Sequence, residues 1–238
     1  VEEMKYLQRD FGISYIVFSD DLLMCSTPRT IEVCEAIIKS GLKIKWNCSG
    51  RLNYARPDIL KLMKEAGCVF INYGIESVDN EVLKNMKKGL NHDQIIAGVE
   101  ATRDLGIHAG LNIIFGNLGD TPQTLQQSVD FLKTYNDGGQ QRTIRPVTPY
   151  PGSPLFFEAI DRGLLKDSRD FYEDKHLNSD LLAVNFTDIA DDDFHALLAD
   201  ANTQLAESHF SKQLSQTKDV IQKLYYEKDT SFRGFRQT

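Results

Sequence analysis

The length, composition and charge of the chain exclude several classes of protein. Its 238 residues are 41% hydrophobic and 26% charged, enough to bury the core of one large domain or two small ones. The net charge of −7 argues against broad binding to nucleic acid or to an anionic membrane surface, because both need a basic patch. No apolar run approaches the ~20 residues of a membrane-spanning helix, so we expect neither nucleic acid nor a membrane as a partner.

Short apolar segments alternate with amphipathic segments along most of the chain. Helices are predicted over residues 1–11, 27–41, 56–67, 79–106 with a break near 88–93, and 121–139. Strands are predicted over residues 14–19, 42–48, 68–75, 108–116 and 141–150. Thr27 is the expected N-cap of the second helix, and Gly41 its end. Asn91 or Asp93 is expected to cap the helix that follows the break.

The predicted strands are short and apolar on both faces, which is typical of parallel strands covered by helices. We therefore predict an α/β fold with right-handed crossover connections. After residue 151 the pattern changes to turn residues, acidic irregular segments and a long helical stretch. We interpret residues 1–154 as the α/β core and residues 155–238 as an appended helical region.

The cysteines bear on metal binding and on cellular location. Cys25, Cys34, Cys48 and Cys68 stand 9, 14 and 20 residues apart, so no CxxC motif exists and no local metal site is predicted. The charged N-terminal segment does not resemble a secretory signal. We therefore expect reduced thiols and a cytoplasmic location.

Every predicted strand ends in polar residues, and parallel strands carry their sites at these carboxyl ends. The polar residues at the five strand ends are Asp20 and Asp21; Asn47, Ser49, Arg51 and Asn53; Asn72, Tyr73, Glu76 and Ser77; Asn112 with Asp120 in the loop; and Thr148 and Tyr150. The convergence of five such ends predicts one shared pocket.

Structural roles remain open for these residues. Asp20 and Asp21 could cap the following turn, and Glu76 with Ser77 could cap the helix near residue 79. Arg51 and Arg56 could be solvated or paired with Asp58. Asn112 interrupts an apolar strand, and a buried amide there would need hydrogen-bond partners. The five histidines are scattered and predict no metal site or catalytic triad.

The order and spacing of several short motifs resemble the radical S-adenosylmethionine (SAM) enzymes. They are "FSDD", "NYGIESVDNEVLKNMKKG", "GLNIIFGNLGDTPQT" and "RPVTPYPGSPLFFEAIDRGL", and the resemblance covers residues 1–165. The chain looks most similar to the branch in which a cobalamin-binding domain precedes the core. The resemblance implies a partial, open (β/α)₆ TIM-like barrel, here without its first strand. It also implies that a [4Fe–4S] cluster reduces SAM to yield a 5′-deoxyadenosyl radical.

The resemblance implies contacts to the methionyl end of SAM. Asp20 and Asp21 would accept hydrogen bonds from its ammonium group. Glu76 matches a polar position near the ribose and the methionyl group. Either Lys88 or Arg51 would pair with the carboxylate, and the sequence does not decide between them.

The resemblance also implies contacts to the adenosyl end and to a small-molecule substrate. Asn112 matches a position that faces the ribose hydroxyls, and Ile114 one against which the adenine lies. Val147 and Thr148 would offer backbone hydrogen bonds to the adenine edge. Tyr150 is the candidate for contact with substrate.

Departures from the family pattern limit these expectations. The CxxxCxxC motif that holds the cluster is missing, and the four cysteines have the wrong spacing to replace it. "LGDT" stands where the family usually has PGET. The valine at position 1 favours a truncated piece of a longer enzyme over a homologue that never binds the cluster. We therefore expect the cluster, and cobalamin, to belong to the parent protein, and this chain alone to be inactive.

Two other readings of the same residues stay open. The chain could be a non-catalytic α/β barrel that binds a nucleotide-like ligand or a partner protein. It could also be a magnesium-dependent lyase or hydrolase that uses Asp20, Asp21 and Glu76 as oxygen ligands. A barrel that lacks its first strand would leave an unpaired edge near residues 14–19, and we expect self-association through it.

Overall fold

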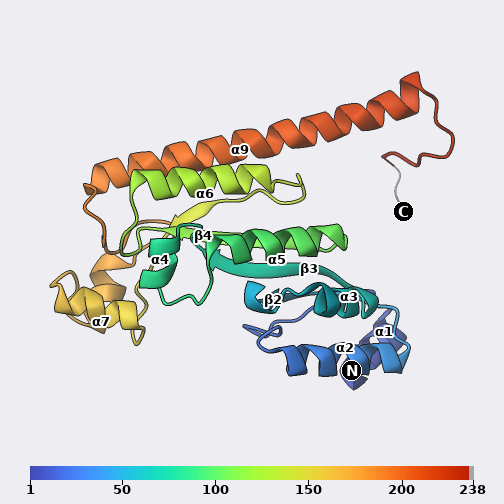
Figure 1. Ribbon diagram of the computed structural model, residues 1–238, viewed down its shortest axis with the longest axis horizontal. Coiled ribbons are helices and arrows are strands. Elements are labelled where there is room, and N and C mark those ends of the chain that lie inside the picture. Colours follow the sequence, from blue (N-terminus) through green and yellow to red (C-terminus); the bar gives the residue numbers. More distant parts are fainter. Residues whose placement is uncertain (236–238) are drawn as a thin grey trace. The chain divides into compact units, whose positions relative to one another are not determined.

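The computed structural model describes residues 1–235 and divides the chain into two compact units, Val1–Asp120 and Thr121–Thr238. The first unit holds four strands of the described chain, and the second holds one further strand and the longest helix (Figure 1). The predicted boundary between a core ending at residue 154 and an extension over residues 155–238 stays a prediction. Residues 236–238 of that extension lie outside the described residues.

The four strands of the first unit are parallel and follow one another in the order β1-β2-β3-β4. They are β1 (Tyr15–Val17), β2 (Lys45–Gly50), β3 (Cys68–Glu76) and β4 (His108–Phe115). The prediction of parallel strands is confirmed, but β1 is shorter than predicted and β2 begins later. The start of β2 is set by pairing, because Lys45 N donates to Ser14 O at 2.9 Å.

One helix precedes these strands, and four helices and one short turn connect them. They are α1 (Glu2–Phe11), α2 (Thr27–Ser40), the 3₁₀ turn η1 (Leu52–Tyr54), α3 (Pro57–Glu65), α4 (Asn80–Asn85) and α5 (His92–Asp104). The predicted break after residue 79 is confirmed as the gap between α4 and α5, and Asn91 caps α5 in a reciprocal capping box with Gln94. The predicted N-cap Thr27 is wrong: Ser26 takes that position, and its hydroxyl accepts from Arg29 N.

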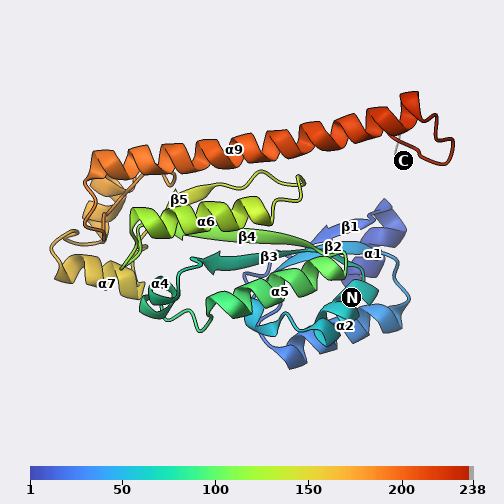
Figure 2. The same ribbon diagram turned by 45° about the horizontal axis from the view of Figure 1, so that its top comes forward.

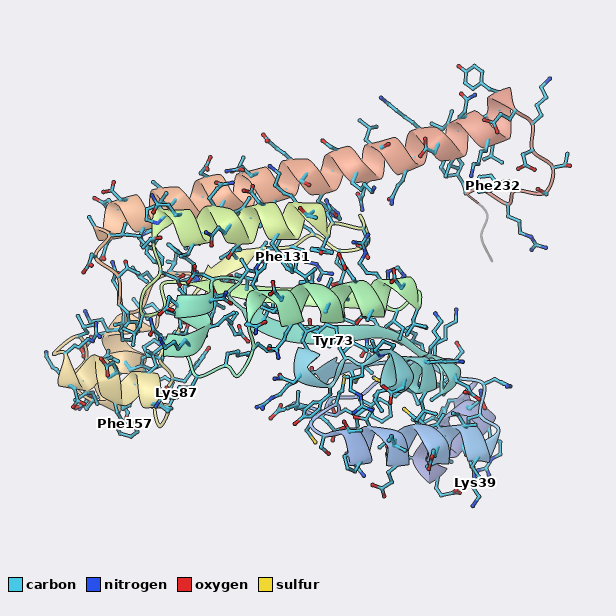
Figure 3. The ribbon with its side chains drawn as sticks, in the orientation of Figure 1. Lys39, Tyr73, Lys87, Phe131, Phe157 and Phe232 are labelled. Carbon is cyan, nitrogen blue, oxygen red and sulfur yellow. The ribbon has the colours of Figure 1, made fainter. Side chains whose placement is uncertain are left out.

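One face of this sheet is covered by helices. Trp46 and Tyr73 are fully buried on it, and each is tied to a covering helix. Trp46 Nε1 donates to Ala66 O, at the end of α3, at 2.8 Å. The hydroxyls of Tyr73 and Thr102, on α5, lie 3.0 Å apart; Figure 3 labels Tyr73 on β3. Burying each ring contributes roughly 1.5–3 kcal/mol, so these contacts determine which face of the sheet turns inward.

The alternation of parallel strands with covering helices confirms the predicted α/β class and the open, partial barrel. The helix-covered face is apolar and contains Cys48 and Cys68, and a third buried cysteine, Cys34, lies on α2. The opposite face carries the polar side chains, because neighbouring residues of a strand point to opposite faces.

The second unit is mainly helical. It contains α6 (Pro122–Thr134), β5 (Ile144–Pro146), α7 (Pro154–Asp161), α8 (Ser168–Asp170), the π turn η2 (Phe171–Lys175), α9 (Asp191–Ile221) and the π turn η3 (Gln222–Tyr226). Helix α6 and strand β5 are shorter than predicted. Helices α6 and α9 lie side by side, and α9 extends beyond the end of α6 (Figure 2).

Helix α9 binds the strand of its own unit through a side chain. Ile144 N donates to Asn202 Oδ1, and Asn202 Nδ2 donates to Ile144 O, both at 2.9 Å. The carboxamide thus makes the pair of hydrogen bonds that a neighbouring strand would make. Within residues 1–235, no helix has both the length and the apolar character needed to cross a membrane.

We expect Asn202→Ala to destabilise the protein by about 1–3 kcal/mol, because it leaves the buried N–H and C=O of Ile144 without partners. Urea denaturation followed by circular dichroism measures this loss. Thr203→Ala, on the exposed side of the same helical turn, is the matched control and should change stability by less than about 0.5 kcal/mol. Equal stabilities of the two variants would contradict the role of Asn202.

Candidate functional site

The open polar face of the sheet lies opposite the helix-covered face that carries Trp46 and Tyr73. It is defined by Asn47, Ser49, Asn72 and Asn112. Ser49 pairs in register with Asn72, and Asn112 pairs with Gly74. Side chains on the same face of neighbouring strands lie within reach of one another. The structure therefore brings together polar residues from β2, β3 and β4, and the predicted convergence of all five strand ends on one pocket stays a prediction.

Glu76 and Lys88 form an ion pair on this open polar face. Lys88 Nζ donates to Glu76 Oε1 at 3.1 Å, and the two side chains are 25% and 23% exposed. Glu76 has a φ of +72°, and the pairing of β3 with β4 shifts register between Gly74 and Glu76. A left-handed backbone in a residue other than glycine costs about 1–3 kcal/mol, and such strain occurs most often at functional sites.

The hypothesis that Glu76 and Ser77 cap the next helix is wrong for Glu76. Asp79 is the N-cap of α4, and its carboxylate accepts from Glu81 N and Val82 N. Ser77 Oγ accepts only from Asp79 N, just before the helix. The carboxylate of Glu76 therefore binds Lys88 and lies on the open polar face.

The turn that carries Lys88 is held by Asn53, which the sequence placed among the polar strand ends without a specific role. Lys88 N donates to Leu83 O at 3.0 Å, and Asn53 Nδ2 donates to Gly89 O at 2.7 Å. Figure 3 labels the neighbouring Lys87 in the same turn. Asn53 follows β2, and the only sequence signal for its role was a polar residue at a strand end.

Asp120 organises the loop that follows β4. Its Oδ2 atom accepts from Gly116 N at 3.0 Å and from Asn117 N at 2.8 Å, and its side chain is buried. This is the loop in which "LGDT" replaces the family's PGET. Asp120, whose side chain is shorter than that of the glutamate in PGET, thus accepts hydrogen bonds from the backbone of its own loop. The sequence did not predict this role.

Asn112 and Ile114 lie on β4 at the positions predicted to contact the ribose and the adenine. Asn112 is exposed, so the expectation that its amide is buried and needs internal partners is wrong. Ile114 is half-buried, and its carbonyl accepts from Asn117 Nδ2 at 3.4 Å. Both positions leave the open polar face available to a ligand.

Asp20 and Asp21 lie on the exposed loop after β1. Within residues 1–235 neither carboxylate has a hydrogen-bond or ion-pair partner, so neither caps the following turn. Asp20 lines a cavity of about 240 Å³ together with Phe18, Leu23 and residues of α1 and α2. Their predicted role toward an ammonium group stays a prediction.

Arg51 and Arg56 differ in whether they form an ion pair. Arg56 forms two hydrogen bonds with Asp58, at 3.1 and 2.6 Å, and this contact lowers the pKa of the Asp58 carboxyl. The predicted pairing with Asp58 is therefore confirmed for Arg56. Arg51 is exposed and makes no ion pair with any described residue, which leaves it available to an anion.

Val147, Thr148 and Tyr150 belong to the second unit. Val147 is buried, Thr148 is half-buried, and Tyr150 is 50% exposed. The Tyr150 ring lies edge-on to Phe171 and His176, with centroid distances of 5.9 and 5.4 Å. Their predicted contacts to adenine and substrate stay predictions.

The buried cysteines do not fit a [4Fe–4S] cluster. Burial raises the pKa of Cys34 to about 12, and a hydrogen bond with Cys48, together with burial, raises the pKa of Cys68. The thiolate is the form that binds metal, so these environments oppose ligation. Among residues 1–235 no group of three His, Cys, Asp or Glu side chains could hold a metal ion, and the magnesium hypothesis stays a prediction.

Comparison with known proteins agrees with this geometry. Residues 1–132 match the model of the radical SAM superfamily, and the chain therefore belongs to that family of enzymes. It is 34% identical over 165 residues to an uncharacterized methyltransferase (PH0819) of Pyrococcus horikoshii, covering 69% of this chain and 36% of the relative.

A second relative and one solved structure extend the comparison. The bacteriochlorophyllide d C-12(1)-methyltransferase of Chlorobaculum tepidum is 30% identical over 202 residues, covering 78% of this chain and 42% of the relative. The radical SAM methyltransferase TsrM of Kitasatospora setae, solved with cobalamin and a [4Fe–4S] cluster, has the same fold. Its TM-score is 0.58 at 19% identity, over 68% of this chain and 33% of TsrM. The chain spans well under half the length of these proteins.

We expect iodoacetamide at pH 8 to modify Cys25 and to spare Cys34, Cys48 and Cys68. Cys25 is exposed, whereas with a pKa of about 12 only about 10⁻⁴ of Cys34 is thiolate at that pH. Mass spectrometry of the native protein should show one label, and the denatured control four. The labelling of Cys34 should increase as the pH rises toward 12; rapid labelling at pH 8 would refute its burial.

Proposed function

We propose that this chain is the SAM-binding core of a radical SAM enzyme that acts on a small molecule. The observation that carries the proposal is the partly buried Glu76–Lys88 ion pair at the end of β3, on the open polar face of a superfamily member. Ligands of parallel α/β sheets bind at the carboxyl ends of the strands. The names of the relatives favour methyl transfer as the reaction of the parent enzyme.

Each end of SAM has a matching residue. Lys88 would pair with the methionyl carboxylate, with exposed Arg51 as the other candidate. Glu76 would bind a cationic or hydroxyl group, and Asn112 the ribose hydroxyls. Ile114 offers the apolar surface that adenine requires. Asp20 and Asp21 complete the contacts proposed for the first unit, and the contacts of Val147, Thr148 and Tyr150 in the second unit stay predictions.

The chain's own contribution is to bind and orient SAM. When bound, a [4Fe–4S] cluster supplies the electron that starts radical chemistry in this superfamily. The described residues offer no ligands for it, so we expect the chain by itself to bind SAM without cleaving it. By analogy with the solved relative, we extend the proposal to cobalamin in the parent protein. A cytoplasmic location of that protein is part of the same proposal.

We expect SAM to bind the native chain and Lys88→Met to weaken binding at least about tenfold, because a charge-assisted hydrogen bond is lost. Isothermal titration calorimetry measures both affinities. Lys61→Met is the matched control, because Lys61 is exposed on α3, and its affinity should equal that of the native chain. Absence of binding to the native chain, or equal affinities for all three proteins, would refute the proposal.

A second proposal concerns association of two copies through β1. This strand pairs with β2 on one side, and Tyr15 and Val17 are 45% and 63% exposed. Phe18 N donates to Asn47 O and Lys45 N donates to Ser14 O, so the N–H of Val17 points away from β2. An edge of this kind is a template for another strand.

We expect the sedimentation coefficient of the native chain to rise with concentration. Val17→Pro removes an outward N–H without disturbing the pairing with β2, and should abolish that rise. Circular dichroism of the variant shows whether the fold is retained. A native chain that sediments as a monomer at high concentration would count against association.

A further inference from the structure

One row of residues on the open polar face has no role in the contacts proposed for SAM. Ser49 pairs in register with Asn72, and Asn72 pairs with Gly110, so the row crosses β2, β3 and β4. It lies beside the row of Gly74 and Asn112, on the side of the amino ends of the strands. A ligand that contacts this row therefore lies further from the carboxyl ends of the strands than the proposed SAM contacts do.

Gly110 makes room for two side chains of the neighbouring strand β3. A Cβ atom at position 110 would lie 2.8 Å from the ring of Phe70 and would overlap with Asn72 Oδ1. The φ of Gly110 is not in the left-handed region, so the lack of a side chain serves these neighbours and not the backbone. The carboxamide of Asn72 and the ring of Phe70 therefore both lie over the main chain of Gly110.

The carboxamide of Asn72 has unused hydrogen-bonding capacity. Asn72 is half-buried, and within residues 1–235 neither its carboxamide nor the hydroxyl of Ser49 forms a hydrogen bond with another residue. By contrast, the carboxamide of Asn47 on the same face donates to the Tyr15 hydroxyl at 3.0 Å. An amide side chain carries two donors and one acceptor, and such groups normally have partners when they are covered. Asn72 can therefore offer all of them to a ligand.

The charged residues of these strands stand at the strand ends. Of the Asp, Glu, Lys and Arg residues, β2 has only Lys45, its first residue, β3 has only Glu76, its last residue, and β4 has none. Glu76 is in turn paired with Lys88. A charged group beside Asn72 would lose water without gaining an opposite charge, whereas a neutral group loses less and can make the same hydrogen bonds. The row therefore favours an uncharged ligand group.

We propose that Asn72 is a specificity-determining residue that binds a neutral carbonyl or carboxamide group of the small-molecule substrate. The donors and the acceptor of its side chain match such a group, and the adjoining ring of Phe70 offers a surface to the apolar part that bears it. Gly110 is the positioning residue, because it leaves the space in which the carboxamide lies. The inference rests on the proposed function and deepens it, since it assigns a chemical class to the substrate.

The test uses three probes of one shape with the full chain: benzamide is neutral, benzoate is an anion and benzamidine is a cation. The native chain should bind benzamide at least about tenfold more tightly than the other two, as expected when one hydrogen bond is lost. Asn72→Asp should reverse the order, so that benzamidine binds at least about tenfold more tightly than benzamide, because a carboxylate accepts from a cation. Titrations followed by nuclear magnetic resonance give the affinities.

Gly110→Ala provides a second measurement that introduces no charge. The added methyl group displaces the Asn72 carboxamide, so this variant should bind benzamide about tenfold more weakly than the native chain. Circular dichroism shows whether each variant retains the fold.

Asn80→Asp is the matched control. Asn80 is exposed on α4, and its Oδ1 atom accepts from His92 N, which an aspartate can also do. This variant should keep the native order of the three probes. If Asn72→Asp keeps that order too, or if the native chain does not bind benzamide, the inference is overturned, while SAM binding measured by calorimetry upholds the proposed function. If the chain does not bind SAM, the proposed function fails and the inference with it.

Discussion

The anchoring of one sheet face to its covering helices is the constraint on which the site depends. Trp46 and Tyr73 are fully buried and hydrogen-bonded to α3 and α5, so β2 and β3 cannot slip by a residue without expelling them. Because side chains alternate, the same contacts force Asn47, Ser49 and Asn72 to the other face. The polarity of the site therefore follows from the packing of the core.

The sequence was sufficient for features that depend on local chemistry. Alternating apolar and amphipathic segments predicted parallel strands with covering helices, and Asn91 was one of two predicted caps for α5. Glu76 and Lys88 were assigned to one site, but their bond, the bulge before Glu76 and its left-handed backbone were not foreseen. These features depend on β4 and on the turn after α4, which a pattern along one strand does not contain.

One error concerns the face of a strand on which a residue lies. Asn112 was expected to be buried because apolar residues surround it in sequence, yet alternation turns it outward. Asp20 was grouped with the other strand ends, and its contribution to that site stays a prediction; its loop lines a cavity formed with α1 and α2. The cysteines differ from these cases, because their spacing in sequence predicted no local cluster and their environments agree. Burial raises the pKa of Cys34, and a hydrogen bond with Cys48 together with burial raises that of Cys68, so both disfavour the thiolate.

The hydrogen bonds from Asn202 to both backbone groups of Ile144 have a consequence for proteolysis and expression. Cleavage anywhere between β5 and residue 202 would uncover the main chain of a buried, β-branched residue. A segment of that kind pairs readily with other chains. Shortened products that end before α9 should therefore collect in insoluble material, even though they retain every residue of the open polar face.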